Sequence, residues 1–418
     1  MIQRLVPLLL LVGLLPASAQ EAPVDDPEQL AELAVQSQPT LDAARARIDA
    51  LQSMASASRL WADPMVAVEL SNLPVTAPWI NQHPMAGIQL KLQQRFLAPG
   101  QAEARSVAAD ARTEAAEAVL PTLANELRGE VRERYWDLAL VRQLRGLTDQ
   151  QVTELDGLIE SVQVRYQVGA ANQHDLLQLQ LKRDRLAELL PDLDARAAML
   201  QSGLNGALAR DPATPIRTPG STPAVPLPGT ADERREALQR HPALSELRAA
   251  AAAERAESAR ARVESVPGPT AWLGYRVRSV QTNGDPGTNF VTAGVSVPLP
   301  AASARRWSAA AGASDARARA AEEAAEGRAV RLAARLESLE AQHARATDRA
   351  TAYRDALETS ARAALESTLA AYQVDRAQFS DLIRAQLDLI DVQRQRVTAE
   401  ADAARARASV RTLIAGVE

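Results

Sequence analysis

The stretch RYQVGAANQHDLL at residues 165–177 returns later in the chain as AYQVDRAQFSDLI at residues 371–383. Two shorter matches extend the repeat outward: QPTLDAARAR at 38–47 resembles HPALSELRAA at 241–250, and AGIQLKL at 86–92 resembles AGVSVPL at 293–299. An internal repeat of this size decides the architecture before any local motif does. We therefore expect a first repeat at 20–209 and a second repeat at 232–418, joined by a Pro-rich linker at 210–231.

The first nineteen residues, 1–19, have the pattern of a secretory signal peptide. Arg4 precedes an apolar run from Leu5 to Leu15, and Pro16 is followed by the small residues of a cleavage site. No later run approaches about twenty apolar residues, so the mature chain is expected to have no membrane-spanning helix. The sequence thus predicts export with a cleaved signal peptide.

Several classes of site are not expected from the composition. The chain has no cysteine, which excludes disulfides, thiolate metal sites and a lipid-modified N-terminal Cys, so a lipoprotein is not expected. Its four histidines are scattered, so no metal site and no cofactor is expected; they are His83, His174, His241 and His343. Basic and acidic residues interleave along a chain of net charge −5, which does not indicate a nucleic-acid partner.

An enzyme is not expected either. The sequence contains no Gly-rich phosphate loop and no nucleophile elbow, and its carboxylates are spread along helix faces.

Each repeat contains two short segments in which apolar and polar residues alternate. The apolar positions are Val66, Val68 and Leu70, then Ile88, Leu90 and Leu92, and in the second repeat Ala271, Leu273, Tyr275 and Val277, then Val291, Ala293, Val295 and Val297. The intervening positions carry charged, amide and small groups. Alternation of this kind, with aromatic residues gathered near the strand ends, is typical of an outer-membrane β-barrel.

Long helical stretches follow each pair of strands. We expect a helix from about Pro27 to Trp61, helices over 101–167 and 302–373, and return helices over 175–208 and 381–414. At about 1.5 Å per residue the longest of these span roughly 100 Å, and helices so long need lateral, coiled-coil-like packing.

The duplicated segment is expected to form the turn between each long helix and its return helix. Gly169 supplies the break in the first copy, with Asn172 or Asp175 as the N-cap. In the second copy, Asp375 occupies the glycine position. Either Asp375 adopts the glycine-like conformation or the two turns differ.

Four strands cannot close a barrel, and open strand edges are not tolerated in lipid. The chain is therefore expected to oligomerise. Two copies would supply eight strands and three copies would supply twelve, and strand count alone leaves both open.

The tip motif, Tyr-x-Val-Gly with Asp nine residues after the Tyr, and the order of the elements resemble the outer membrane efflux protein family. Its members are the TolC-like exit ducts of tripartite efflux systems. The resemblance implies a mainly α fold with a membrane β-barrel: four barrel strands per protomer, a homotrimeric twelve-stranded barrel, and a long coiled-coil tunnel in the periplasm. It also implies residence in the outer membrane of a Gram-negative bacterium, in contact with lipid.

The same resemblance implies the function and partners of the chain. It would conduct substrates passively, receiving them from a periplasmic adaptor protein and an RND-type inner-membrane pump. DPMVAVELSNLP at 63–74 and QQRFLAPG at 93–100 resemble the heavy-metal branch of the family. Metal ions and drugs both stay open as substrates.

The resemblance assigns the first tip to adaptor docking. The residues that match the docking motif are Tyr166, Val168, Gly169 and Ala170. The family usually has Leu where this chain has Ala170.

The resemblance assigns the periplasmic gate to Tyr372, Asp381, Asp175 and Arg376, with Asp381 in a ring that constricts the pore. Arg384 stands where some members have a second pore Asp. A gate needs bonds that are individually weak, and Tyr hydroxyls and Asp–Arg pairs of about 1 kcal/mol each meet that need. The alternative is that Asp175 and Asp381 only cap their return helices.

A second function fits the same pattern of elements. The chain could be a periplasmic coiled-coil scaffold or adaptor protein whose short sheets are soluble.

Overall fold

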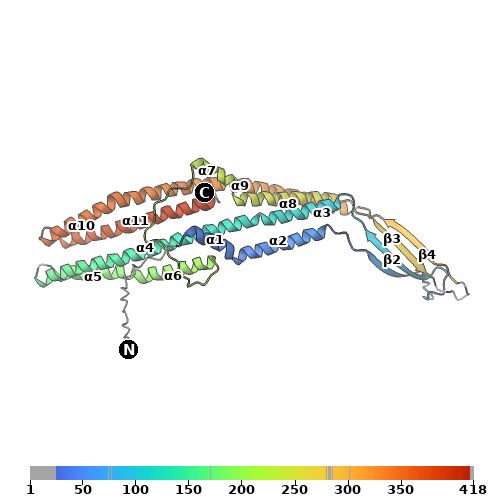
Figure 1. Ribbon diagram of the computed structural model, residues 1–418, viewed down its shortest axis with the longest axis horizontal. Helices are drawn as coiled ribbons and strands as arrows, with labels where there is room; N and C mark the ends of the chain where they lie inside the picture. The colour runs from blue at the N-terminus through green and yellow to red at the C-terminus, as the bar shows by residue number, and fades with distance from the viewer. Residues whose placement is uncertain are drawn as a thin grey trace, which may run out of the picture.

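The computed structural model describes residues 25–73, 75–76, 78–169, 171–278, 280, 284, 286–300 and 302–414. The signal segment at 1–19 and the tip residue Ala170 lie outside the described residues. The molecule is long and narrow, with a β-sheet at one end and the tips of two helical hairpins at the other (Figure 1). The expectation of a mainly helical chain with four strands is confirmed.

The first half begins with two short helices, α1 (Pro27–Ser37) and α2 (Pro39–Ser58). The helix expected from Pro27 to Trp61, with its second part beginning at Pro39, is divided at Gln38 and ends at Ser58. Gln38 has an extended backbone because it precedes a proline, and Pro39 then starts α2 at its first position.

The long helix of the first half is α3 (Gln101–Glu117) followed by α4 (Val119–Gln167), and its return helix is α5 (Gln173–Ala187) followed by α6 (Leu189–Ala207). Both divisions, at Ala118 and Glu188, lie three residues before a proline, Pro121 and Pro191 respectively. Proline has no N–H to donate to the carbonyl four residues earlier, so the helical hydrogen bonding is interrupted there.

The second half contains α7 (Ala231–Gln239), α8 (Pro242–Glu264), α9 (Ser303–Ala352), α10 (Glu358–Gln373) and α11 (Phe379–Leu413). Between α9 and α10 the helix widens into a π-helical segment, η1 (Tyr353–Leu357). The stretch expected as one uninterrupted helix therefore contains a π-helical turn, although it has no proline.

The strands are β1 (Met65–Ser71), β2 (Gly87–Arg95), β3 (Thr270–Val277) and β4 (Phe290–Ser296). They form one antiparallel sheet in the order β1-β2-β3-β4. Residues from the two halves meet at the centre of this sheet, where Leu90 of β2 lies opposite Tyr275 of β3. β1 and β4 are its edges.

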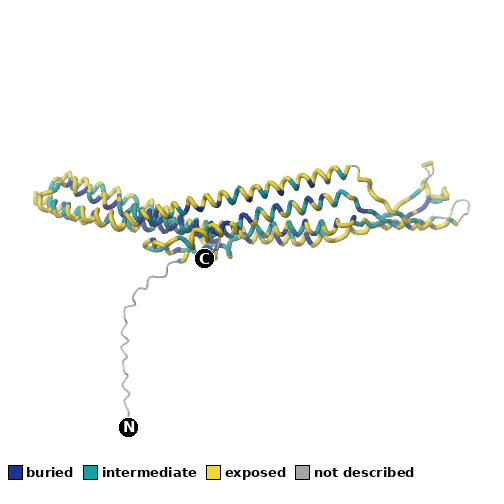
Figure 2. The backbone as a smooth tube through the Cα atoms, turned by 90° about the horizontal axis from the view of Figure 1, so that it is seen from above, coloured by how far each residue is buried: buried dark blue, intermediate teal, exposed yellow. Residues whose placement is uncertain are grey.

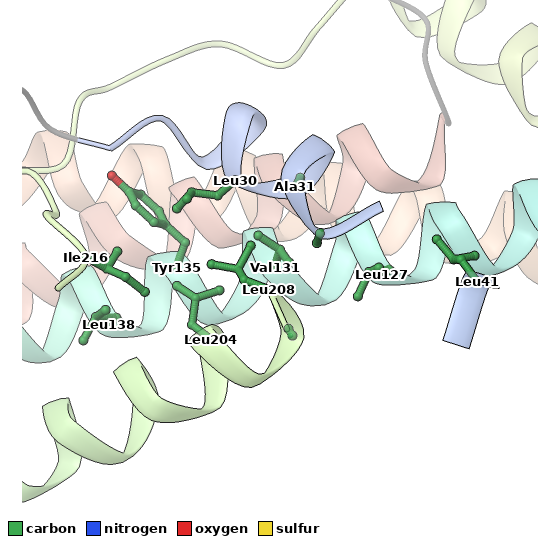
Figure 3. Packing of buried hydrophobic residues seen from close by; sticks show 12 residues of the cluster. Leu30, Ala31, Leu41, Leu127, Val131, Tyr135, Leu138, Leu204, Leu208 and Ile216 are labelled. Carbon is green, nitrogen blue, oxygen red and sulfur yellow. The ribbon is translucent and has the colours of Figure 1, made fainter. Parts of the chain in front are cut away.

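Buried residues lie along the inner faces of the helices, mostly in the middle of the molecule (Figure 2). One cluster joins α1, the start of α2, α4, α6 and Ile216 of the linker around Tyr135 (Figure 3). The Tyr135 hydroxyl donates to the Asp25 carbonyl at 2.7 Å, and burial raises the pKa of Tyr135 to about 12.

Two further clusters lie elsewhere along the helices. One joins α7 and α8 to α9 and α11, and the other joins the two hairpins near their tips.

The Pro-rich linker runs in extended form across the middle of the helices. Gln143 of α4 donates to the Pro219 carbonyl at 3.0 Å, and Arg407 of α11 donates to the Pro226 carbonyl at 3.0 Å. These bonds satisfy linker carbonyls that have no partner in regular secondary structure.

Candidate functional site

The first tip is a tight turn between α4 and α5. Gly169 has a φ of 76°, a conformation that favours glycine. Asn172 is the N-cap of α5, and the Asp175 carboxylate accepts from its backbone N–H at 3.4 Å. Asp175 therefore contributes to a capping box.

The second tip makes the same kind of turn without a glycine. Asp375 has a φ of 58°, so of the two alternatives left open by the sequence it adopts the glycine-like conformation. Asp is one of the few residues other than Gly that visit this region, with help from local hydrogen bonding. The two turns thus share a backbone shape but differ in charge.

Arg165 joins the two tips. Its Nη1 donates to the Gln373 carbonyl at 2.8 Å, and its Nη2 forms an ion pair with the Asp375 carboxylate. Its guanidinium also lies 4.7 Å from the centre of the Tyr372 ring. Sequence reasoning did not expect Arg165 to contact the second tip, although the motif contains it. Asp375 puts a negative charge where the first copy has Gly169, and this difference was the sequence signal for a contact with a nearby cation.

Tyr372 lies between the two hairpins. It is only 6% exposed, and its ring is 6.0 Å from that of Phe379 in a cluster that also contains Val162 of α4. Burial raises the pKa of Tyr372, the positive charge of Arg165 opposes that rise, and the negative charge of Asp175 adds to it. The structure therefore brings two expected gate residues, Tyr372 and Asp175, into the same electrostatic environment.

The other two expected gate residues are exposed. Asp381 lies in the first turn of α11, where a negative charge favours the helix dipole, and Arg384 is its ion-pair neighbour at 4.0 Å. Arg376 is exposed on the turn itself. Within one protomer these groups do not join Tyr372 and Asp175.

The expected docking residues point outward. Tyr166 is 42% exposed and Val168 is 75% exposed, and Gly169 is also exposed. The two tyrosines of the duplicated motif therefore have opposite environments: Tyr166 is on the surface and Tyr372 is in the core.

At the opposite end of the molecule, one face of the sheet is apolar and exposed. We call it the apolar face; its large side chains are between 41% and 70% exposed and are Val66, Val68, Leu70, Ile88, Leu90, Leu92, Leu273, Tyr275, Val277, Val291 and Val295. A continuous exposed surface of this kind marks contact with lipid or with another protein.

We call the other side of the sheet the polar face. Lys91 lies 3.5 Å from Glu69, and Arg276 donates to the Gln89 side chain at 2.9 Å. Gln89 in turn donates to Thr292 at 3.0 Å. These bonds join all four strands on one side of the sheet, so this face is a hydrogen-bonded polar surface.

Within the part of the chain that the structure describes, no three His, Asp or Glu side chains come together to hold a metal ion. None of the described helices is both long enough and apolar enough to cross a membrane.

Solved structures share this arrangement over nearly the whole chain. The outer membrane protein VceC from Vibrio cholerae matches with a TM-score of 0.75 and 17% identity, over 93% of this chain and 96% of VceC. The outer-membrane channel OprN matches with a TM-score of 0.76 and 18% identity, over 94% of this chain and 91% of OprN. The chain has the fold of an outer-membrane channel.

The MtrE outer membrane channel of Neisseria gonorrhoeae, solved in an open state, matches with a TM-score of 0.71 and 15% identity, over 93% of this chain and 89% of MtrE. The resemblance to the outer membrane efflux proteins is thereby confirmed at the level of the fold. No family model and no curated protein matches the sequence.

Proposed function

We propose that three copies of this chain form an exit channel in the outer membrane of a Gram-negative bacterium, passively conducting metal ions or drugs. The observation that carries the proposal is the exposed apolar face at one end of a long helical body. In lipid that face needs no cover, whereas in water it would favour aggregation.

The two edge strands support the oligomeric part of the proposal. β1 and β4 have no partner on their outer sides among the described strands. Lipid does not tolerate unpaired backbone groups, so β4 of one copy would pair with β1 of the next until the sheet closes. Three copies would give twelve strands around a water-filled lumen lined by the polar face.

The helices would continue from that barrel into the periplasm as a tunnel. The two repeats, at 20–209 and 232–418, would each contribute one hairpin to its far end. There the exposed Tyr166, Val168 and Gly169, with Ala170, would meet a periplasmic adaptor protein, which links the channel to an RND-type pump.

Asp381, Arg376, Tyr372 and Asp175 would form the gate. The exposed Asp381 and Arg376 are available to neighbouring protomers, whereas the Tyr372 ring packs between the two hairpins of one protomer, where the charge of Asp175 acts on it. Asp175 can act as a cap and as a gate residue at once.

Fractionation and electrophoresis test the channel. We expect the mature protein in the outer-membrane fraction as a trimer that resists SDS until it is heated. Recovery as a detergent-free soluble protein of the periplasm would contradict the proposal and would favour the scaffold or adaptor function.

Conductance in planar bilayers tests the gate. Asp381→Ala and Tyr372→Phe should each raise the open probability, because each removes a group that would form a weak, exchangeable bond in the closed trimer. If both variants conduct like the parent protein, these residues only cap and pack.

A further inference from the structure

The polar face carries an excess of positive charge. Lys91, Arg95 and Arg276 lie on it by the register of the strands, against one carboxylate, Glu69. This face therefore has three cationic side chains and one anionic side chain on its strands, in a chain whose net charge is −5.

Among the described residues, Lys91 is the only one of these three cations with a carboxylate partner on this face. Arg276 donates to the amide oxygen of Gln89, which is only 6% exposed and carries no charge. Lys91 has the carboxylate of Glu69 at 3.5 Å and the ring of Trp272 at 5.0 Å. An amide and an aromatic ring orient a cation without neutralising it.

Glycines let the large side chains of this face lie flat against the sheet. A Cβ on Gly294 would come within 2.6 Å of the Trp272 ring, and a Cβ on Gly274 would come within 2.7 Å of the Thr292 hydroxyl and closer still to the Gln89 amide. The side chains therefore cover the backbone of the neighbouring strand, which leaves the space in front of the face open.

We propose that the polar face is a cationic lining that favours anionic organic substrates over metal cations. The proposal rests on the proposed function, because it requires this face to line the lumen of the barrel. Three copies repeat the same excess charge around one axis, and low-dielectric walls focus the field of such a ring into the lumen. Carboxylate-, sulfonate- or phosphate-bearing molecules would concentrate there, and hydrated divalent cations would be repelled.

The absence of cysteine makes a local test possible. Gln93→Cys places a single thiol on the polar face, and Leu90→Cys places one on the apolar face of the same strand. The purified trimer is reconstituted in phospholipid vesicles, and each thiol is treated with a sulfonate-bearing or an ammonium-bearing methanethiosulfonate reagent. Both rates are divided by those for a free thiol in solution.

At Gln93→Cys the normalised rate of the anionic reagent should exceed that of the cationic reagent. Adding Arg276→Gln or Arg95→Gln removes one charge per protomer and so three charges per trimer. With these charges about 10 Å from the thiol at physiological salt, their loss should lower the ratio of the anionic to the cationic rate about threefold. Arg235→Gln in α7, remote from the sheet, is the matched control and should leave the ratio unchanged. Two arginine variants are used because Arg276→Gln also removes the hydrogen bond from Arg276 to Gln89. Arg95 is exposed at the end of its strand, so Arg95→Gln changes the charge alone.

A ratio near one, or one that favours the cationic reagent, would overturn the cationic lining. The proposed function fails in a different way. If Leu90→Cys reacts with both charged reagents as fast as Gln93→Cys does, the apolar face is in water and the sheet is not a membrane barrel.

Discussion

A charge on the apolar face should prevent assembly in the membrane, whereas the same charge on the polar face should not. Leu90 lies near the middle of β2, opposite Val68 on one side and Tyr275 on the other, with half of its surface exposed. Leu90→Arg would therefore bring a guanidinium into the hydrocarbon region.

The size of the effect follows from the depth of the residue. An Arg on the lipid face of a barrel costs about 2–4 kcal/mol near the bilayer midplane. Three copies in one trimer would lose roughly 6–12 kcal/mol, which is comparable to the whole stability of many folded domains. Leu90→Arg should abolish the SDS-resistant trimer, and folding into phospholipid vesicles should fail at urea concentrations that the parent protein tolerates.

Gln93→Arg is the matched control. Gln93 belongs to the same strand and lies at a similar distance from its middle, but it is on the polar face, opposite Trp272. It should assemble with a loss of at most about 1 kcal/mol per protomer from repulsion by nearby cations. Equal assembly of both variants, or failure of Gln93→Arg alone, would refute the assignment of the apolar face to lipid.

Three further predictions concern local stability, measured by urea unfolding of the extracted protein. The Nδ1 of His241 accepts from the Ala243 N–H at 3.1 Å, and burial, with the charge of Arg328, lowers the pKa of His241 from 6.5. The unfolded chain therefore binds the proton more readily, so stability should fall as the pH drops below 6.5, and His241→Asn should keep the cap and remove this dependence. The free energy of unfolding of Asp375→Gly should be within about 0.5 kcal/mol of the parent value, because relief of backbone strain offsets the lost ion pair with Arg165. Asp375→Ala keeps the strain and loses the ion pair, so it should lower the free energy of unfolding by about 1 kcal/mol. Equal effects of the two substitutions would contradict the strain argument. Because the pKa of Tyr135 is raised to about 12, the stability of its cluster should be retained up to pH 10 and lost as the pH approaches 12; Tyr135→Phe should show no such loss.

The tips and the strands could be located from the sequence, for physical reasons. A duplicated motif marks equivalent places in two copies, so the position of Gly169 in one turn identified Asp375 as its counterpart, and only the structure shows that both have the same backbone shape. Large apolar residues at every second position over seven to nine residues favour a strand with two different faces.

Contacts between the two repeats could not be located in this way. The pairing of β2 with β3 and the bonds from Arg165 to the second tip join segments that are distant in sequence. No periodicity encodes them, because they depend on how the two hairpins lie side by side.

The π-helical segment η1 is a similar case. Its sequence contains neither glycine nor proline, and the extra residue in its turn accompanies packing against α11, where Arg354 donates to Glu400 at 2.7 Å. A helix that is regular in its own sequence can thus be widened by a partner.

The glycine at position 294 affects how wide the lumen of the proposed channel can be. Trp272 rests on that glycine, and even one methyl group there would push the indole ring away from the wall. In a three-fold assembly the displacement would occur at three places at the same height. The width of the lumen would then depend on position 294 having no side chain. A single-base change in the gene that replaces this glycine with alanine could narrow it.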